Sequence, residues 1–229
     1  MSAGRLVGVR ALVIGHDHIG GTGHVGTALT AAGWSLEKFT VVPAHRFTSP
    51  DVEAEFPSAD GYDLVLTLGA PWPRSAISTW AGSEVDFLAT VHERGTPILG
   101  ICAGAQFLAE ALGGGCTPLG VERVGWHAVR SRGGVVPSGP WFQWHADRIG
   151  VSAGAEVIAD SEDGPEVFRV GNSVGVQFHP EMSAALLDRW LGATPIPDQR
   201  AAELRLAAAA HEHDALDRAE ALLRGLRWI

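Results

Sequence analysis

The segment around Cys102 constrains the fold of this chain more than any other part of the sequence. Residues 97–101 form a short apolar run with the length of a buried parallel strand. Residues 105–112 carry apolar side chains at helical spacing, and Gly113 follows them as a typical helix end. A buried strand that turns at once into a helix is typical of α/β proteins.

Cys102 stands at the junction between this strand and this helix. Gly100 before it and Gly104 after it relieve crowding on a turn too sharp for side chains at both positions. The same strand–nucleophile–helix geometry carries the serine of hydrolase elbows. A helix N-terminus also favours the thiolate, which is the reactive form of cysteine. Taken alone, however, a buried cysteine is more often a small core residue than a nucleophile.

The composition narrows the class of protein. A chain of 229 residues, 46% hydrophobic and 19% charged, can bury the core of one α/β domain and is unlike a disordered chain. Its formal net charge of -9, without a Lys/Arg cluster, argues against nucleic acid or an anionic membrane as a partner. No apolar run reaches transmembrane length. The two cysteines, Cys102 and Cys116, fit free thiols in a reducing cytoplasm.

Alternating strand and helix patterns predict a mostly parallel open sheet with helices on both faces, followed by a small antiparallel excursion and C-terminal helices. The expected strands are 6–14, 34–42, 62–68, 97–101, 119–131, 133–138, 155–161, 166–170 and 173–178. The expected helices are 25–32, 83–94, 105–112, 183–191 (with Ser183 as N-cap) and one or two over 198–226. We divide the chain into a main domain, residues 1–193, and a C-terminal helical extension, residues 194–229.

The glycine-rich segment after the first expected strand gives only a weak signal for a cofactor. Gly21, Gly23 and Gly26 match the dinucleotide fingerprint by letter, but a loop separates them from the strand that should lead directly into the first glycine. His16 and His18 in the same segment are not expected to form a metal site. We therefore expect no cofactor and no metal.

A base for Cys102 is available at the end of the last expected strand. A cysteine nucleophile needs a base, and the base needs an orienting acceptor. His179 follows that strand, and Glu181 two residues later points the same way in an extended segment and can reach the imidazole. Active sites of parallel sheets lie at the C-terminal ends of strands, where the Gly69-Ala70 turn and Cys102 are also expected as neighbours.

Three segments together resemble the class I glutamine amidotransferases, the type with a Cys-His-Glu site. They are residues 100–106 (GICAGAQ), 174–181 (VGVQFHPE) and 67–71 (TLGAP), in the family's order and spacing. Residues 142–147 are further similar to stand-alone members that resemble the amidotransferase part of GMP synthase. The resemblance covers roughly residues 5–192 and implies a flavodoxin-like fold.

The resemblance also implies roles in catalysis. Cys102 would attack the side-chain amide of glutamine to give a γ-glutamyl thioester and ammonia. His179 would take the thiol proton and donate it to the departing ammonia, and Glu181 would orient His179. The main-chain N–H groups of Ala70 and Ala103 would form the oxyanion hole.

Substrate contacts follow from the same resemblance. Gly69 in the oxyanion turn and Gln106 would contact bound glutamine, and the backbone of Trp144 and His145 would meet its α-amino and carboxylate groups. The chain departs from the family's usual pattern at Ala70, where a second glycine is usual, at Ala105, where histidine is commoner, and at Arg123, where glutamate is frequent. Ala70 still offers an N–H donor unless the turn requires a positive φ there.

Three functions remain open at this point. One is a glutamine amidotransferase or glutaminase whose ammonia passes to a separate synthetase, because nothing in the chain resembles an ATP-binding or acceptor domain. Another is a γ-glutamyl peptidase or hydrolase that acts on γ-glutamyl amides of other amines. The third is a non-catalytic binding or regulatory protein, against which the intact Cys, His and Glu argue. The C-terminal helices could pack on the domain or form an oligomer surface, and the sequence favours neither.

Overall fold

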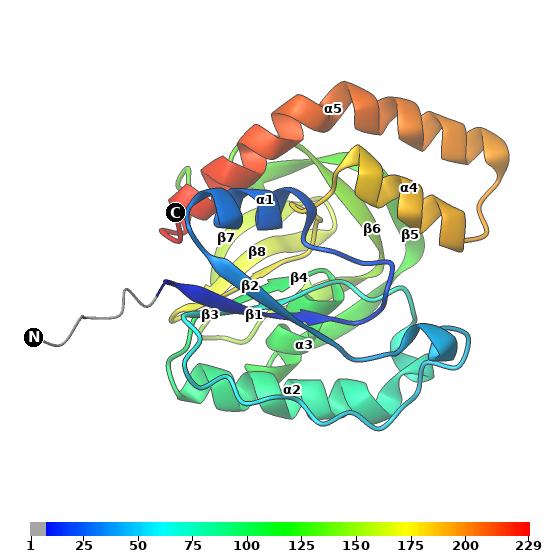
Figure 1. The fold of residues 1–229 in the computed structure, drawn as a ribbon. Coiled ribbons are helices and arrows are strands. Elements are labelled where there is room, and N and C mark those ends of the chain that lie inside the picture. The colour runs from blue at the N-terminus through cyan, green and yellow to red at the C-terminus, as the bar shows by residue number, and fades with distance from the viewer. Residues whose placement is uncertain (1–7) are drawn as a thin grey trace, which may run out of the picture.

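The computed structural model describes residues 8–229, which are built on one nine-stranded sheet (Figure 1). The strand order across the sheet is β2-β1-β3-β4-β9-β8-β7-β5-β6. The strands are β1 (Arg10–Gly15), β2 (Ser35–Thr40), β3 (Leu64–Thr67), β4 (Ile98–Ile101), β5 (Gly115–Ser131), β6 (Gly139–Gly150), β7 (Glu156–Ser161), β8 (Gly164–Val170) and β9 (Ser173–Val176). The α-helices are α1 (Gly23–Ala31), α2 (Ser78–Glu93), α3 (Ala103–Ala111), α4 (Ala184–Ala193) and α5 (Asp198–Gly225), and short 3₁₀ helices span Ala44–Arg46 and Arg74–Ala76.

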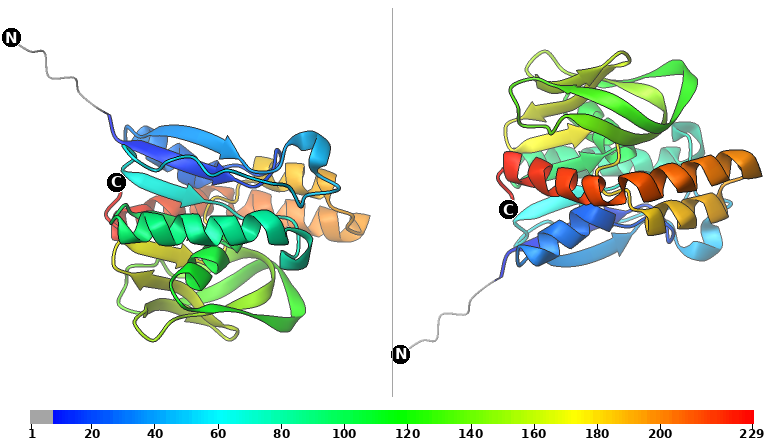
Figure 2. Two further views of the ribbon diagram at one scale, coloured as in Figure 1. Left: turned by 90° about the horizontal axis from the view of Figure 1, so that it is seen from below. Right: turned by 90° about the horizontal axis from the view of Figure 1, so that it is seen from above.

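The first five strands in this order are parallel and are covered by helices on both faces (Figures 1 and 2). Side chains alternate along β1, so that Ala11 and Val13 join the core shared with α1 and α5. Leu12 and Ile14 point the other way and join the core shared with α2 and α3. The predicted open sheet with two helical layers is therefore confirmed. Its inner strands β1, β3, β4 and β9 are buried on both faces, whereas the edge strand β2 is largely exposed.

The antiparallel half differs in detail from the prediction. The segment predicted as short strands over 119–131 is part of one long strand, β5, which pairs with β6 across a register shift between Pro118 and Arg123. The predicted strand at 133–138 is wrong, because these residues form the loop between β5 and β6. The predicted pair 155–161 and 166–170 is confirmed as the β7–β8 hairpin. Residues 6 and 7 of the first predicted strand lie outside the described residues.

The C-terminal region folds back on the domain. It forms a single helix, α5, that lies beside α1 and α4 (Figure 2, right). Its inner side chains Leu222 and Leu223 are fully buried, and Trp34 Nε1 donates a hydrogen bond to the carbonyl of Trp228 at 3.0 Å. Ser183 caps α4 as predicted by accepting a hydrogen bond from the N–H of Leu186. Among residues 8–229, none of the helices has the length and apolar character needed to cross a membrane.

Candidate active site

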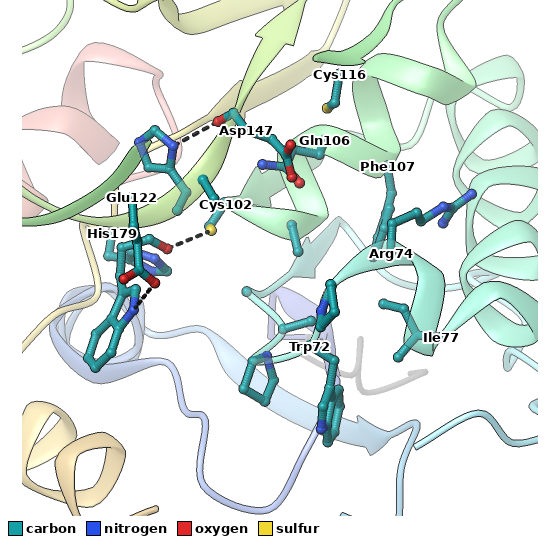
Figure 3. A pocket seen from close by; sticks show the side chains of 18 of the residues that line it. Trp72, Arg74, Ile77, Cys102, Gln106, Phe107, Cys116, Glu122, Asp147 and His179 are labelled. Atoms are coloured by element: carbon teal, nitrogen blue, oxygen red, sulfur yellow. Dashed lines mark hydrogen bonds between the residues drawn. The ribbon is translucent and has the colours of Figure 1, made fainter. Parts of the chain in front are cut away.

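Three neighbouring parallel strands end at the same edge of the sheet and deliver the predicted site residues there. β3 pairs with β4 (Thr67 opposite Gly100), and β4 pairs with β9 (Ile101 opposite Val176). The Gly69-Ala70 turn follows β3, Cys102 follows β4, and His179 follows β9. The prediction that the first two segments are neighbours is confirmed, and His179 joins them at the same edge (Figure 3).

The turn at Cys102 depends on two close backbone approaches. Cys102 itself has φ 51° and ψ -110°, a strained conformation for a residue with a side chain, and it immediately precedes α3. A Cβ at Gly100 would lie 2.7 Å from the carbonyl oxygen of Gly104, and one at Gly104 would lie 2.5 Å from that of Thr67. The sequence prediction that both glycines relieve crowding around a nucleophile-elbow turn therefore has a steric basis.

His179 and Glu181 form a buried pair beside Cys102. Nδ1 of His179 lies 2.7 Å from Oε1 of Glu181, and both side chains are 2% exposed. Nε2 of His179 is buried and lacks a hydrogen-bond partner among the described residues. Burial lowers the pKa of His179, but the charges of Glu181 and of a Cys102 thiolate outweigh it and raise the pKa to about 10. The arrangement therefore favours the imidazolium form of His179, whose Nδ1 faces Glu181 while Nε2 stays free.

The turn after β3 lies directly against this pair. A Cβ at Gly69 would lie 3.0 Å from Cε1 of His179 and 3.5 Å from Cβ of Cys102. Among the non-glycine residues described, only Cys102 and Arg227 have positive φ, so Ala70 fits the turn without strain. Within residues 8–229, the N–H groups of Ala70 and Ala103 donate no backbone hydrogen bond in a turn, loop or helix cap. Both residues line a cavity above Cys102.

Two further side chains support this turn from the buried side, and the sequence analysis did not find them. Nδ1 of His16 lies 2.9 Å from the carbonyl oxygen of Gly69, and Nε2 lies 2.8 Å from Oε2 of Glu84 in α2. Thr67 donates a 2.5 Å hydrogen bond to the other oxygen of Glu84. Glu84 lies on the buried stripe of α2 with Ala81 and Leu88. The carboxylate of Glu84 within the apolar stripe of α2 was the one feature of the sequence that could have indicated this buried contact.

The cavity above Cys102 is large. It measures about 700 Å³ and has Cys102 and His179 on one side and Trp72, Arg74 and Ile77 across from them (Figure 3). The predicted substrate-binding residues all line it. They are Gly69, Gln106, Trp144 and His145.

Hydrogen bonds hold Trp144 and His145 of β6 in place at the cavity. The Cys102 thiol lies 3.7 Å from the carbonyl oxygen of Trp144, and Nε1 of Trp144 donates to Glu122 at 3.1 Å. His145 is held between the Gln143 side chain and the carbonyl of Asp147. Burial lowers the pKa of His145 to about 4, so its side chain is neutral near pH 7 and contributes no charge to the cavity.

Gln106 and Arg123 have partners of different kinds. Gln106 donates to the side chain of Gln177 at 3.3 Å at the cavity wall. Arg123 makes a bidentate ion pair with Asp163 at 2.6 and 2.7 Å. The residue that departs from the family's usual glutamate thus has a partner on the β7–β8 turn. Among residues 8–229, no three His, Cys, Asp or Glu side chains form a group that could hold a metal ion.

Several known proteins are similar to this chain in sequence or in fold. The crystal structure of a glutamine amidotransferase from Thermotoga maritima superimposes on this chain with a TM-score of 0.79 at 25% sequence identity, covering 96% of this chain and 98% of that one. The GMP synthase [glutamine-hydrolyzing] of Mycolicibacterium paratuberculosis is 31% identical over 153 residues, which are 63% of this chain and 27% of that protein. Its counterpart in Corynebacterium glutamicum is 30% identical over 166 residues, 66% of this chain and 29% of that protein. The chain thus spans little more than a quarter of the length of these relatives.

The sequence model of the family "Glutamine amidotransferase class-I" matches residues 25–190. These residues include the turn after β3, Cys102 and the His179–Glu181 pair. This match covers most of the chain. The chain therefore belongs to the class-I glutamine amidotransferase family.

Proposed function

We propose that this protein hydrolyses the γ-amide of glutamine to glutamate and ammonia through a thioester on Cys102. The observation that carries the proposal is the strained Cys102 turn beside a buried His179–Glu181 pair. Such a nucleophile, base and orienting carboxylate are the three parts that covalent acyl transfer needs.

The first half of the reaction forms the thioester. The Cys102 thiolate attacks the amide carbon of glutamine, and the carbonyl oxygen becomes an oxyanion. The N–H groups of Ala70 and Ala103, which have no partner in a loop or cap of the described chain, stabilise this oxyanion. The His179 imidazolium then gives its proton to the amide nitrogen, the C–N bond breaks, and ammonia leaves.

The second half regenerates the thiolate. Neutral His179 takes a proton from water as the water oxygen attacks the thioester carbon. The C–S bond breaks, glutamate leaves with the new carboxyl group, and the Cys102 thiolate and His179 imidazolium are restored. Glu181 keeps Nδ1 of His179 protonated at 2.7 Å throughout, so Nε2 is the nitrogen that exchanges protons.

The direct test is to replace the nucleophile. We expect Cys102→Ala to abolish glutamate release and Cys116→Ala, a change at the second cysteine of the same cavity, to leave it within about threefold. Incubation with glutamine should add a γ-glutamyl mass to Cys102 in the Cys116→Ala protein. Turnover that survives Cys102→Ala would overturn the mechanism, and a wild-type protein that binds glutamine without turnover or labelling would favour a non-catalytic role.

The size of the cavity favours a second candidate, hydrolysis of γ-glutamyl amides that carry a larger amine. A cavity of about 700 Å³ is of the size that holds drug-sized ligands, whereas glutamine is much smaller. The wall across from Cys102 carries Trp72 and Ile77, with Phe47 also in the lining. These side chains would contact an apolar amine while the γ-glutamyl group stays at Cys102.

A panel of substrates separates these two functions. Purified protein is given glutamine, γ-glutamyl-methylamide and γ-glutamyl-anilide, and kcat/KM is measured for each. A higher kcat/KM for the anilide that falls at least tenfold in Trp72→Ala would favour the amide hydrolase. Preference for glutamine, unaffected by Trp72→Ala, would favour the glutaminase.

We further propose that the ammonia serves a separate synthetase. The support is that the matched relatives are named GMP synthase [glutamine-hydrolyzing], a name that joins glutamine hydrolysis to a synthesis. Labelling of Cys102 by glutamine with slow release of glutamate, accelerated by a second protein that consumes ammonia, is the expected result. Fast glutamine turnover by the chain alone would argue for an independent hydrolase.

A further inference from the structure

The buried side of the oxyanion turn contains polar groups that take no part in the proposed chemistry. The side chains of His16 and Glu84 are fully buried, and Thr67 is buried with them. His16 lies stacked on Trp80 with ring centroids 5.0 Å apart and against the edge of Phe107 at 5.8 Å. A buried ionisable pair is costly unless its geometry is well satisfied, so its presence below the turn calls for an explanation.

The hydrogen bond from His16 reaches the peptide group that carries the proposed oxyanion donor. The carbonyl oxygen of Gly69 and the N–H of Ala70 belong to one planar trans peptide and point in opposite directions. Nδ1 of His16 holds that oxygen at 2.9 Å. Fixing the oxygen on the buried side therefore fixes the N–H on the other side, and Ala70 lines the cavity together with Cys102.

We propose that His16, held by Glu84 and Thr67, is a positioning residue that aims the Ala70 N–H at the oxyanion. The proposal rests on the proposed function, because it needs Ala70 to donate to a tetrahedral intermediate at Cys102. His16 does not touch the substrate, and it acts through the Gly69–Ala70 peptide.

The direction of the hydrogen bond is set by its acceptor. A carbonyl oxygen can only accept, so Nδ1 of His16 carries a proton in either charge state of the ring. Glu84 then faces Nε2 at 2.8 Å and receives the Thr67 hydroxyl on its other oxygen at 2.5 Å. Every side-chain polar atom in this hydrogen-bond network, which links Thr67, Glu84 and His16 to the Gly69 carbonyl, has a partner. A buried network that is fully satisfied in this way rigidifies its surroundings.

The consequence of losing this support is a peptide free to rotate. With nothing holding the Gly69 oxygen, the peptide can turn and take the Ala70 N–H away from the oxyanion. An oxyanion donor matters in the transition state much more than in the ground state. The expected signature is therefore a lower kcat with substrate binding preserved.

Two substitutions at His16 form a matched pair for the test. In His16→Asn, the side-chain amide takes the place of Nδ1 and keeps the donor to Gly69 while losing the contact with Glu84. In His16→Gln, the amide reaches Glu84 and loses the donor to Gly69. We expect His16→Gln to lower kcat about 10- to 100-fold, and His16→Asn, which keeps the donor to Gly69 but loses its support from Glu84, to lower kcat about three- to tenfold. Ground-state binding, measured by calorimetry in the Cys102→Ala background, should change less than about twofold in both.

The outcomes separate this proposal from the proposed function and from a merely structural role. If the wild type forms no Cys102 adduct and releases no glutamate or amine, the proposed function fails and takes this proposal with it. If the wild type turns over and both variants lose activity in proportion to their loss of Tm or of binding, His16 is structural and the proposal is overturned. Equal kcat in both variants overturns it as well.

A second variant covers the case in which His16→Gln does not fold. Thr67→Val is close to isosteric and removes only the hydrogen bond to Glu84. We expect it to lower kcat about three- to tenfold with unchanged substrate binding, because the hydrogen-bond network that holds the Gly69 carbonyl loses its bond from Thr67 to Glu84. An unchanged kcat in a folded Thr67→Val protein would contradict the proposal.

Discussion

At the scale of single residues, the charge on His179 is set by burial and by two negatively charged neighbours that act against it. Burial opposes the imidazolium, and Glu181 and the Cys102 thiolate support it, with a net rise of the pKa to about 10. Removing either negative charge removes part of that support and leaves the burial penalty. We expect the pKa of His179 to fall in Cys102→Ala and in Glu181→Gln, so that the ring loses its proton at a lower pH than in the wild type.

The measurement is an NMR titration of the His179 Cε1–H signal, assigned with a His179→Gln protein. Cys116→Ala serves as the control, because Cys116 is not among the groups that shift the pKa of His179. A pKa that remains near 10 without Cys102 would show that the thiolate does not face the ring. The same result would remove the basis for proton transfer between these residues.

At the scale of elements, the turn from β4 into α3 depends on the absence of a side chain at Gly104. Alanine is favoured over glycine in a helix by about 1 kcal/mol, but here its Cβ would lie 2.5 Å from the Thr67 carbonyl oxygen. Overpacking of this kind costs about 1–3 kcal/mol. We expect Gly104→Ala to lower the free energy of unfolding, measured by urea denaturation with an unchanged m-value.

The matched control lies in a helix where space is available. A Cβ at Gly82 in α2 meets no atom within 4 Å, so Gly82→Ala should stabilise the protein by about 0.5–1 kcal/mol. Steric contact and helix propensity thus act with opposite sign at the two positions. Stabilisation by Gly104→Ala would mean that the Cys102 turn tolerates a side chain and that the close approach of β3 and α3 is not required.

The same turn explains why the sequence was informative at this level. Gly100, Cys102 and Gly104 are adjacent in the chain, and their constraint is local, so the strand–cysteine–helix unit could be predicted. The long β5–β6 pair could not be predicted, because its partners lie from 10 residues apart (Val129 and Gly139) to 35 residues apart (Gly115 and Gly150), and its register shifts between Pro118 and Arg123. Residues 133–138 (GGVVPS) were predicted as a strand but form the loop between β5 and β6.

At the scale of the whole molecule, the site is assembled from segments that the chain order separates. His179 and Glu181 were found because they share one strand end, and the resemblance to the family linked them to Cys102. His16 and Glu84 were missed because their meeting requires the packing of α2 against the end of β1. No local pattern carries that contact. The polar network formed by several elements is therefore the part of this site that could not be predicted from the sequence.

The C-terminal helix gives the last prediction, which concerns the unity of the fold. Leu222 in α5 is fully buried in the core that also contains Ala11, Val13 and α1. Leu206 in the same helix is 75% exposed. We expect Leu222→Ala to cost about 2–5 kcal/mol and Leu206→Ala to remain within about 0.5 kcal/mol.

If residues 194–229 are an integral layer, both variants unfold in one transition, with far-UV circular dichroism and tryptophan fluorescence coinciding. An early loss of helix signal in Leu222→Ala, with the tryptophan signal unchanged, would instead mark α5 as a separately folding extension. Coincident transitions follow from the position of Leu222, because a side chain shared with β1 and α1 couples the end of the chain to the sheet whose edge carries Cys102.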